Sequence, residues 1–313
     1  MEEYDFLIIG AGGAGLASAM YSARLGLKTL VLGKSSGSEL PIGGVITTTD
    51  NVENYPGFIK LTGTELAENI EKHARSYDLV TVKEERVTKV AREDSDFKVE
   101  TENESYKAKA ILFATGTKVK KLDIPGSTEF ENKGVNYCAL CDSPLFRDKI
   151  VGLIGGSDSA AKDALVLSEH AKKVYVIYRK EKIRAEPINL RRVESRENIE
   201  VINNTNITEI RGDTLVKSVE LDKPYNGSSS LDLDGVFVAI GHIILSDLAK
   251  ELGVNTNEKG EVVTDKMART NVERVYAAGD VADNAFKQLI TGVAEGCTAA
   301  YSAYQDISKD GDN

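Results

Sequence analysis

Two cysteines and an aspartate carry the clearest chemistry in this chain of 313 residues. Cys138 and Cys141 are two residues apart, and Asp142 follows at once. Cysteines at this spacing can close a small disulfide, and an adjacent carboxyl group can shuttle the proton that thiol–disulfide exchange requires. Because the pair lies between two segments that each resemble a dinucleotide-binding turn, the sequence predicts that electrons pass from a cofactor into this disulfide.

Half of a zinc site and a pair of packed thiols are the alternatives for these cysteines. Zinc requires further nitrogen or sulfur ligands, and the other cysteine and histidine residues are Cys297, His73, His170 and His242. None of these four shows a paired spacing, so the sequence predicts no metal site. Cys297 lies in a stretch of small residues typical of a helix, which favours a packed core thiol. His242 follows a strand near an expected hinge, which favours a structural role.

The first turn is Gly10-Ala11-Gly12-Gly13-Ala14-Gly15, which follows an apolar strand and opens a helix. In this pattern Gly10 permits the tight turn, Gly12 lets the backbone approach a pyrophosphate, and Gly15 lets helix and strand pack closely. The anion then lies on the free N–H groups of the helix N-terminus. The alternative is a tight turn that binds no ligand. The acidic residue that usually binds a ribose about 20 residues later is absent, since Leu32 is followed by Gly33.

The second turn departs further from this pattern. Its residues are Gly155, Gly156, Ser157, Asp158, Ser159 and Ala160. Ser157 replaces the second glycine, so its side chain crowds a pyrophosphate, and Asp158 adds a nearby negative charge. The turn therefore predicts either a nicotinamide dinucleotide site or an inherited fold with little nucleotide affinity.

A basic segment follows the next strand of the same unit. Arg179, Lys180 and Arg184 come after Tyr178 and would suit the 2′-phosphate of NADPH, for which arginine offers the better hydrogen-bonding fork. The alternative is a solvated basic face that continues to Arg191 and Arg192.

Near the C-terminal end, the strand-like stretch from Val275 leads into Gly279 and Asp280. We expect Asp280 near a helix N-terminus, where its carboxylate would accept hydrogen bonds from ligand hydroxyl groups. An ordinary helix-capping aspartate is the alternative.

The pattern of elements indicates two α/β units. A strand–helix–strand series is expected over 5–10, 14–25 and 28–32, and again over 149–155, 159–171 and 173–178. A capping box formed by Thr62 and Glu65 predicts a helix over 61–71. Further strands are expected at 87–90, 97–100, 110–115 and 236–240, and a loop at 227–230. The predicted fold has two Rossmann-like three-layer domains: a discontinuous dinucleotide-binding domain of residues 1–116 and 243–313, and an inserted NAD(P)-binding-like domain of residues 117–242.

Composition excludes several other classes of protein. The 39 basic and 49 acidic residues give a net charge of −10, which argues against a nucleic-acid partner. No apolar run approaches the roughly 20 residues of a membrane span, and the acidic N-terminus lacks the features of a secretory signal. With only 3 cysteines, we expect a cytoplasmic protein whose cysteine pair is catalytic.

Taken together, these motifs resemble the low-molecular-weight thioredoxin reductases, an FAD-dependent family of pyridine nucleotide-disulfide oxidoreductases, over essentially the whole chain. The matching stretches are Gly10–Gly15, Gly43–Gly57, Ala114–Gly116, Ile124–Gly126, Cys138–Asp142, Gly241–His242 and Ala278–Asp280 with Gln288.

The resemblance implies FAD in the first domain, a disulfide in the second domain, and a homodimer. It implies that Cys141 faces the flavin, that Cys138 attacks the disulfide of thioredoxin or a similar protein, and that Asp142 donates and accepts the proton. The FAD contacts that it implies are Gly10, Gly12, Gly13, Ala14, Gly15, Gly43, Gly44, Thr48, Asn51, Asn54, Ala114, Thr115, Gly116, Gly279, Asp280, Lys287, Gln288 and Leu289.

The nicotinamide side departs from the family pattern. Ser157 stands in place of a glycine, and Tyr178 and Lys180 stand in place of histidine and arginine. The Pro-Asn pair that usually follows His242 closely is absent. The electron donor is therefore open between NADPH, NADH and a carrier such as ferredoxin, and we expect NADPH to be used weakly or not at all.

The predicted activity is thioredoxin-disulfide reduction through FAD and the Cys138–Cys141 disulfide. Three other functions use some of the same parts: an FAD-dependent dithiol oxidase that passes electrons to oxygen, an FAD-dependent reductase of ferredoxin or another carrier, and a non-catalytic flavin- or nucleotide-binding module. The cysteine–aspartate trio argues against the last. Because one disulfide must reach both a buried flavin and a protein partner, we also expect hinges near Gly116-Thr117 and Gly241-His242.

Overall fold

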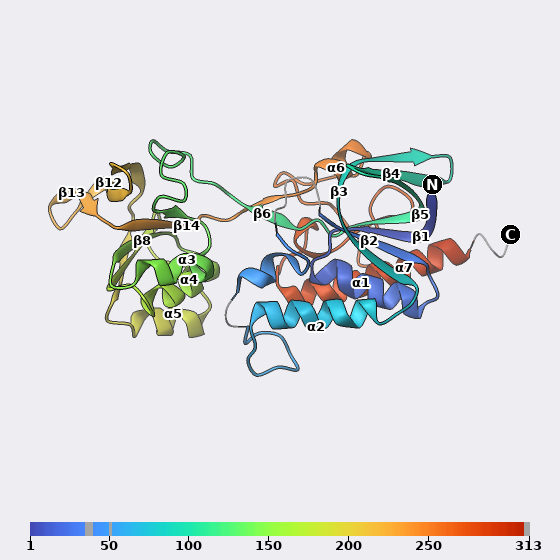
Figure 1. Cartoon of the computed structure of the whole chain (residues 1–313), viewed down its shortest axis with the longest axis horizontal. Coiled ribbons are helices and arrows are strands. Elements are labelled where there is room, and N and C mark those ends of the chain that lie inside the picture. The colour runs from blue at the N-terminus through green and yellow to red at the C-terminus, as the bar shows by residue number, and fades with distance from the viewer. Residues whose placement is uncertain (35–39, 50–51, 310–313) are drawn as a thin grey trace. The chain divides into compact units, whose positions relative to one another are not determined.

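The chain folds into two compact α/β units (Figure 1). A computed structural model describes residues 1–34, 40–49 and 52–309. Unit 1 consists of Met1–Lys118 and Ile244–Asn313, and unit 2 consists of Val119–Ile243. The boundaries expected from the sequence lie within two residues of these (116 against 118, and 243 against 244).

Unit 1 is built on a six-stranded sheet. Its strands are β1 (Glu2–Ile9), β2 (Thr29–Lys34), β3 (Val80–Glu93), β4 (Asp96–Thr101), β5 (Ser105–Phe113) and β16 (Val275–Ala277). β1 pairs in parallel with β2 and β5, and β5 pairs in parallel with β16. The long strand β3 changes partner along its length, because its first half is parallel to β2 and its second half antiparallel to β4.

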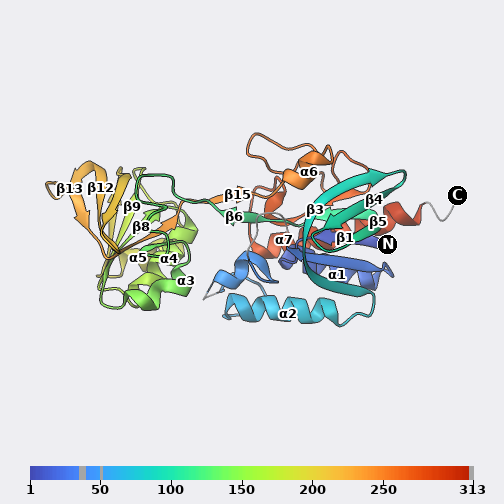
Figure 2. The same cartoon turned by 45° about the horizontal axis from the view of Figure 1, so that its top comes forward.

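The alternation of side chains along β1 buries both faces of this sheet. Phe6 and Ile8 join the apolar cluster with the helices, whereas Leu7 and Ile9 join the cluster with β3, β4 and the short helix α6 (Asp247–Glu251). The helices α1 (Gly13–Arg24), α2 (Gly63–Arg75) and α7 (Leu289–Ser308) lie together on one side of the sheet, and α6 lies on the other (Figures 1 and 2). A capping box of Thr62 and Glu65 opens α2, as predicted.

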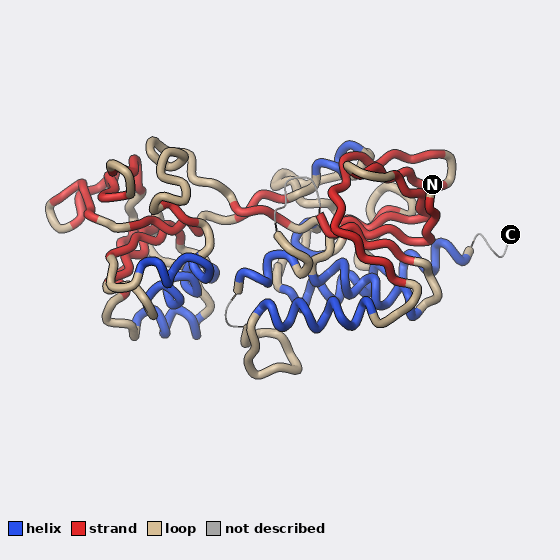
Figure 3. Tube along the Cα trace, viewed as in Figure 1, coloured by secondary structure: helices blue, strands red, loops and turns tan. Residues whose placement is uncertain are grey.

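Unit 2 repeats this plan. Its parallel sheet has the order β10-β9-β8-β14-β7, with strands β7 (Val135–Asn136), β8 (Ile150–Gly155), β9 (Lys173–Tyr178), β10 (Ile199–Asn203) and β14 (Gly235–Ala239). The helices α3 (Ala139–Asp142), α4 (Asp158–Ser168) and α5 (Pro187–Glu194) are blue in Figure 3. An antiparallel sheet completes the unit, with strands β11 (Ile207–Gly212), β12 (Val216–Tyr225) and β13 (Ser228–Asp232).

The chain passes between the units twice, at β6 (Thr117–Val119) and β15 (His242–Ile244), and these two short strands pair with each other. The expected hinge residues lie at the start of these two strands. Within the described part of the chain, no helix is both long enough and apolar enough to cross a membrane.

The α/β class is as predicted, and two local expectations are corrected. The stretch 227–230 is not a loop, because Ser228–Ser230 form the start of β13 and only Gly227 lies in the turn. The strand expected at 87–90 is the middle of the 14-residue strand β3. Both errors arise from pairing with strands whose position the local pattern does not reveal.

Candidate active site

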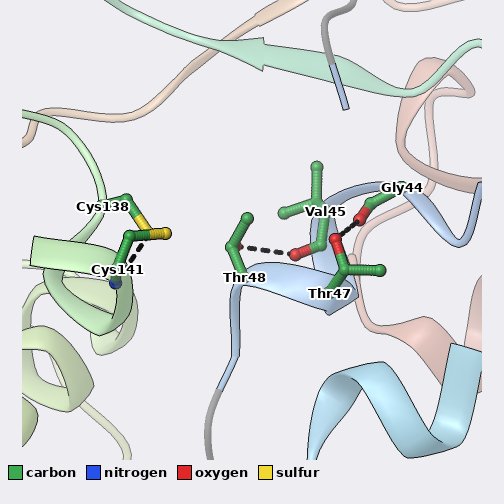
Figure 4. Close-up of a disulfide and its surroundings, with 6 residues drawn as sticks. All are labelled: Gly44, Val45, Thr47, Thr48, Cys138 and Cys141. Atoms are coloured by element: carbon green, nitrogen blue, oxygen red, sulfur yellow. Dashed lines mark hydrogen bonds between the residues drawn. A yellow bond between two sulfur atoms is a disulfide. The ribbon is translucent and has the colours of Figure 1, made fainter. Parts of the chain in front are cut away.

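Cys138 and Cys141 form a disulfide at the start of a helix. Cys138 is the N-cap residue of α3, and the Cys141 amide donates a hydrogen bond of 3.1 Å to the Cys138 sulfur (Figure 4). Cys141 is exposed and Cys138 is partly buried. A sulfur at a helix N-terminus that already accepts an N–H is stabilised as a thiolate after reduction, which makes it a better nucleophile at neutral pH.

Asp142 ends the same short helix. Its backbone amide donates to the Cys138 carbonyl oxygen at 3.1 Å. Burial raises the pKa of its carboxyl group above the usual value of 3.8. A carboxyl group that holds its proton more tightly, next in the chain to Cys141, suits proton exchange with a thiol.

The first glycine turn is shaped for a close-packed strand–helix junction. Gly10 has φ +114°, and a Cβ atom built on it would lie 2.2 Å from the Ala114 carbonyl oxygen. A Cβ on Gly15 would lie 1.9 Å from the Gly10 carbonyl oxygen. Gly12 differs, since its Cβ would meet nothing nearer than 3.9 Å. Gly12 therefore leaves open space beside the backbone, where a ligand can approach.

The N-terminus of α1 is free of side-chain competitors. Its N-cap residue Gly12 makes no side-chain capping bond, and no acidic residue lies in the first turn. The first N–H groups of a helix have no partner within the helix and carry a partial positive charge. This end of α1 is therefore able to bind an anion such as a pyrophosphate.

Segments from distant parts of unit 1 meet at this turn. Gly43 bridges to Gly12 and donates from its amide to the Ala11 carbonyl oxygen at 2.8 Å. The 3-10 helix η1 (Gly44–Thr48) follows Gly43, and the hydroxyl groups of Thr47 and Thr48 donate to backbone oxygens of that same turn (Figure 4). Thr115 donates its hydroxyl hydrogen to the Leu245 carbonyl oxygen.

The residues near Asp280 complete this side of unit 1. A Cβ on Gly279 would lie 3.1 Å from the Ala14 side chain, so Gly279 packs on the first turn of α1. Asp280 lies in the 3-10 helix η3 (Gly279–Val281) and does not cap a helix. Within residues 1–34, 40–49 and 52–309, no group hydrogen-bonds its carboxylate. The Asn54 amide donates to the Gln288 side chain at 3.0 Å.

Two of the expected FAD contacts need separate mention. Asn51 lies outside the described residues. The Lys287 ammonium group is engaged within the chain, because it donates to the carbonyl oxygens of Asp280 and Ala282 and pairs with the Glu261 carboxylate at 3.1 Å.

The second glycine turn is closed by its own side chains. Ser157 is the N-cap residue of α4, and its hydroxyl oxygen accepts from the Ala160 amide at 3.4 Å. The sequence places the charge of Asp158 near a nucleotide, but this carboxylate is engaged within the unit. It accepts from the Glu186 amide and the Asn189 side chain and pairs with Lys162. Although burial acts to raise the pKa of Asp158, these partners hold it below its usual value.

The segment after β9 crosses this turn. The Arg184 amide donates to the Gly156 carbonyl oxygen at 2.6 Å, and a Cβ on Gly156 would lie 2.4 Å from the buried Tyr178 ring. Tyr178 is thus a packing residue against the turn. Arg179, Lys180 and Arg184 are exposed, and no ion pair joins them to any other residue that the structure describes.

Three buried or partly buried groups in unit 1 were missed by the sequence patterns. Glu295 accepts from the Gly279 amide, and burial raises its pKa. Glu261 pairs with Lys287, and Asn284 contacts both Gly279 and Glu295. Of these three groups, only Glu295 could have been noticed in the sequence, because it is an acidic residue among the small residues of α7. Cys297 on the same helix is a free thiol whose pKa burial raises to about 11, as suits a packed and unreactive cysteine.

Two βαβ units, each with a glycine turn, and a cysteine pair closed as a disulfide define a dinucleotide-binding disulfide oxidoreductase. The family model described as pyridine nucleotide-disulphide oxidoreductase matches residues 4–296, and the chain belongs to this family. A thioredoxin reductase of Treponema pallidum (strain Nichols) is 39% identical over 303 residues, which are 96% of each chain.

Solved structures agree with this assignment. The chain is similar to Lactococcus lactis thioredoxin reductase in its FR conformation, with a TM-score of 0.91, 35% identity and coverage of 98% of this chain and 99% of that one. It is also similar to a ferredoxin-flavin thioredoxin reductase from Clostridium acetobutylicum, with a TM-score of 0.52, 29% identity and coverage of 99% of both chains. The resemblance and the fold predicted from the sequence are thereby confirmed.

Proposed function

We infer that this chain is a thioredoxin-disulfide reductase. The observation that carries this conclusion is the Cys138–Cys141 disulfide at the start of α3, with Asp142 beside it. A thioredoxin reductase of Treponema pallidum is 39% identical to this chain over 96% of its length. Thioredoxin, or a small protein with a similar disulfide, is therefore the partner that we propose.

FAD fits the residues of unit 1. The uncapped N-terminus of α1 would hold its pyrophosphate, and the open space beside Gly12 leaves room for the approach. The Asp280 carboxylate, which no described residue hydrogen-bonds, would accept hydrogen bonds from ligand hydroxyl groups. Asn54, Gln288 and the η1 turn would flank the rest of the group. When bound, FAD supplies the two-electron chemistry that reduces a neighbouring disulfide.

The chain's own residues then carry out thiol–disulfide exchange. The Cys138–Cys141 disulfide takes up two electrons, and its S–S bond breaks to give two cysteine thiolates. Asp142 exchanges a proton with one of these thiolates. The Cys138 thiolate attacks one sulfur of the thioredoxin disulfide, and the other thioredoxin sulfur leaves as a thiolate. The Cys141 thiolate next attacks the Cys138 sulfur, which re-forms the internal disulfide and releases reduced thioredoxin. Asp142 returns its proton to a departing sulfur.

The second turn supports a weak interaction with NADPH. The Ser157 hydroxyl oxygen occupies the Ala160 amide, and Asp158 places a negative charge in the first turn of α4. Both features compete with or repel a pyrophosphate at this helix N-terminus. The exposed cations Arg179, Lys180 and Arg184 remain as the support for nicotinamide nucleotide binding at this end of β9. We propose that NADPH and NADH are poor donors.

A reduced carrier protein is the second candidate donor. The specific observation that favours it is the similarity over the full length to the ferredoxin-flavin thioredoxin reductase of Clostridium acetobutylicum. A ferredoxin-type protein would deliver electrons without using the second glycine turn. We further propose a cytoplasmic homodimer, which is supported by the likeness to the thioredoxin reductases.

Anaerobic stopped-flow measurements test the function and the donor together. The flavin of the purified protein is mixed with NADPH, with NADH, or with reduced ferredoxin, and its bleaching is followed. Oxidised thioredoxin is then added to the dithionite-reduced protein, and its free thiols are counted. We expect slow or absent bleaching by NADPH and full reduction of thioredoxin. Absence of thioredoxin thiols after complete flavin reduction would contradict the proposed activity.

A further inference from the structure

The segment that contains Asp280 is tied to neighbouring parts of unit 1 by several hydrogen bonds, whereas no described residue hydrogen-bonds the Asp280 carboxylate. We call Gly279–Gln288 the Asp280 segment. Within it, the Ala282 amide donates to the Gly279 carbonyl oxygen, and the Asp283 amide donates to the Val262 carbonyl oxygen. The Asp283 carboxylate accepts from the amide of Thr264 at 3.2 Å. Hydrogen bonds on both sides of a carboxylate that no described residue contacts indicate that the position of this carboxylate matters.

Glu295 holds the first peptide of this segment from α7. One oxygen of its carboxylate accepts from the Gly279 amide at 2.8 Å and from the Asn284 side chain at 3.0 Å. Asn284 also donates to the Gly279 carbonyl oxygen at 3.1 Å. Both sides of Gly279 are thereby fixed. Gly279 has φ +77°, and glycine is the residue with the greatest freedom to leave such a conformation.

Lys287 and Glu261 hold the next part of the same segment. The Lys287 ammonium group donates to the carbonyl oxygens of Asp280 at 2.9 Å and Ala282 at 2.6 Å. It also pairs with Glu261, which is only 6% exposed and accepts in turn from the Asn257 side chain at 2.7 Å. The ammonium group thus ties the backbone on both sides of Val281 to a buried carboxylate.

We propose that Glu295 and the Lys287–Glu261 pair are positioning residues that fix the Asp280 carboxylate for the hydroxyl groups of the bound dinucleotide. This inference rests on the proposed binding of FAD in unit 1. Neither Glu295 nor Lys287 contacts the cofactor in this account. The Lys287 ammonium group makes three contacts within the chain, and Glu295 Oε2 accepts from Gly279 and Asn284. A carboxylate that is ordered before binding spares the ligand the free-energy cost of ordering it.

The chemistry of the contacts predicts how substitutions differ. Glu295→Gln keeps a carbonyl oxygen that can accept from Gly279, whereas Glu295→Ala removes the acceptor. Lys287→Met keeps a long apolar side chain but removes all three donated contacts. Glu251→Ala is the matched control, because Glu251 is an exposed glutamate at the end of α6 in the same unit.

The test measures FAD affinity by adding FAD stepwise to flavin-free full-length protein and following flavin fluorescence. We expect Glu295→Ala and Lys287→Met to weaken FAD binding by roughly tenfold to a hundredfold, from the loss of hydrogen bonds to charged groups. Glu295→Gln should lie close to wild type, and Glu251→Ala should equal it. A Glu295→Gln protein as weak as Glu295→Ala would overturn the positioning role.

A double-mutant cycle with Asp280→Ala separates positioning from general stability. If Glu295 acts through Asp280, Glu295→Ala will change FAD affinity less than about twofold when Asp280 is already alanine. Equal effects in both backgrounds would overturn the inference. Hydrogen exchange of the Gly279 amide in flavin-free protein gives a second measure, in which Glu295→Ala should speed exchange there and leave β1 unchanged. Wild-type protein that binds no FAD would instead overturn the proposed function, whereas an additive cycle in protein that binds FAD overturns this inference alone.

Discussion

The two glycine turns of this protein have similar strand–helix junctions, but the helix N-termini that follow them differ in how open they are to an anion. Gly10 follows β1 and lies against the Ala114 carbonyl oxygen, and Gly155 ends β8 and lies in the same way against the Ala239 carbonyl oxygen. The third glycine of the first turn, Gly15, corresponds to Ala160 in the second, whose methyl group would lie 3.0 Å from a Cβ on Gly155. The strand–helix junction thus has the same shape in both units.

The difference lies at the helix N-termini. The first turn of α1 has no capping side chain and no acid. The first turn of α4 is capped by Ser157 and contains Asp158, which joins α4 to α5 through Glu186 and Asn189. A helix N-terminus binds either its own side chains or a ligand with the same N–H groups. The comparison teaches that two turns with the same βαβ frame can leave different N–H groups open at the helix N-terminus.

The largest effect should come from removing the chemistry of unit 2 while unit 1 keeps its cofactor. Cys138→Ser and Cys141→Ser should each lower thioredoxin reduction by at least about a thousandfold, because neither single sulfur can complete the exchange. Flavin absorbance of the purified variants should match wild type. A variant that lost flavin as well as activity would break the separation between the two units.

Gly12→Asp should strip FAD from unit 1. Gly12 has an ordinary φ of −78°, and its Cβ would meet nothing nearer than 3.9 Å, so the flavin-free fold should tolerate the change. A carboxylate at the expected pyrophosphate position should weaken FAD binding by roughly a hundredfold or more. Flavin content after purification and circular dichroism of the flavin-free protein check the two parts. Ser157→Asp is the matched change in the second turn and should leave flavin content unchanged.

Asp142→Asn should slow thiol–disulfide exchange by roughly a hundredfold, the usual scale for loss of a positioned acid or base. Since burial raises the folded-state pKa of Asp142 above 3.8, the folded protein binds this proton more tightly than the unfolded chain. Its contribution to stability is therefore present at low pH and is lost as pH rises from 3.8 through the raised value. Asp142→Asn should then melt at a slightly higher temperature than wild type at neutral pH, with no difference at pH values below 3.8.

Asp142 also predicts a feature of the pH–rate profile. In the wild-type pH–rate profile, the inflection that belongs to this carboxyl group should lie above pH 3.8. This inflection should be absent from the profile of Asp142→Asn. Asparagine is the chosen replacement because it keeps the size of the side chain and removes only the titrating group. An unchanged profile in the variant would assign proton exchange to another group.

The smallest effect, and the one that tests the second turn directly, is a gain of NADPH use. Ser157→Gly with Lys180→Arg frees the Ala160 amide and restores a bidentate fork, so NADPH affinity should rise about tenfold or more. Stopped-flow flavin bleaching by NADPH measures this change, and Lys149→Arg, which precedes the opposite end of β8 from the turn, is the control. Tyr178 is kept in both proteins, because its ring packs against Gly156. Rapid bleaching of wild type at micromolar NADPH would show that the second turn is not closed.

Much of the fold and part of the site could be predicted because their signals are local. Glycines at a strand–helix junction, apolar alternation along β1, the Thr62–Glu65 capping box and the Cys138–Asp142 motif each involve residues within a few positions of one another. Backbone geometry and side-chain reach act over such short spans, so the sequence shows them directly. The disulfide chemistry and the family followed from these signals.

The tertiary structure alone decided the contacts between residues far apart in the chain. The sequence placed the Asp158 carboxylate near a nucleotide, but in the structure it accepts a hydrogen bond from the Glu186 amide at the start of α5, 28 residues away. Glu295 reached back 16 residues to Gly279, and Ser228–Ser230 became a strand only through pairing with β12. A polar side chain with several available partners takes the one that folding brings within hydrogen-bond distance, and that choice depends on how helices and strands pack. The sequence therefore determined the frame and the reactive cysteines, whereas packing decided which polar groups remained free to meet a ligand.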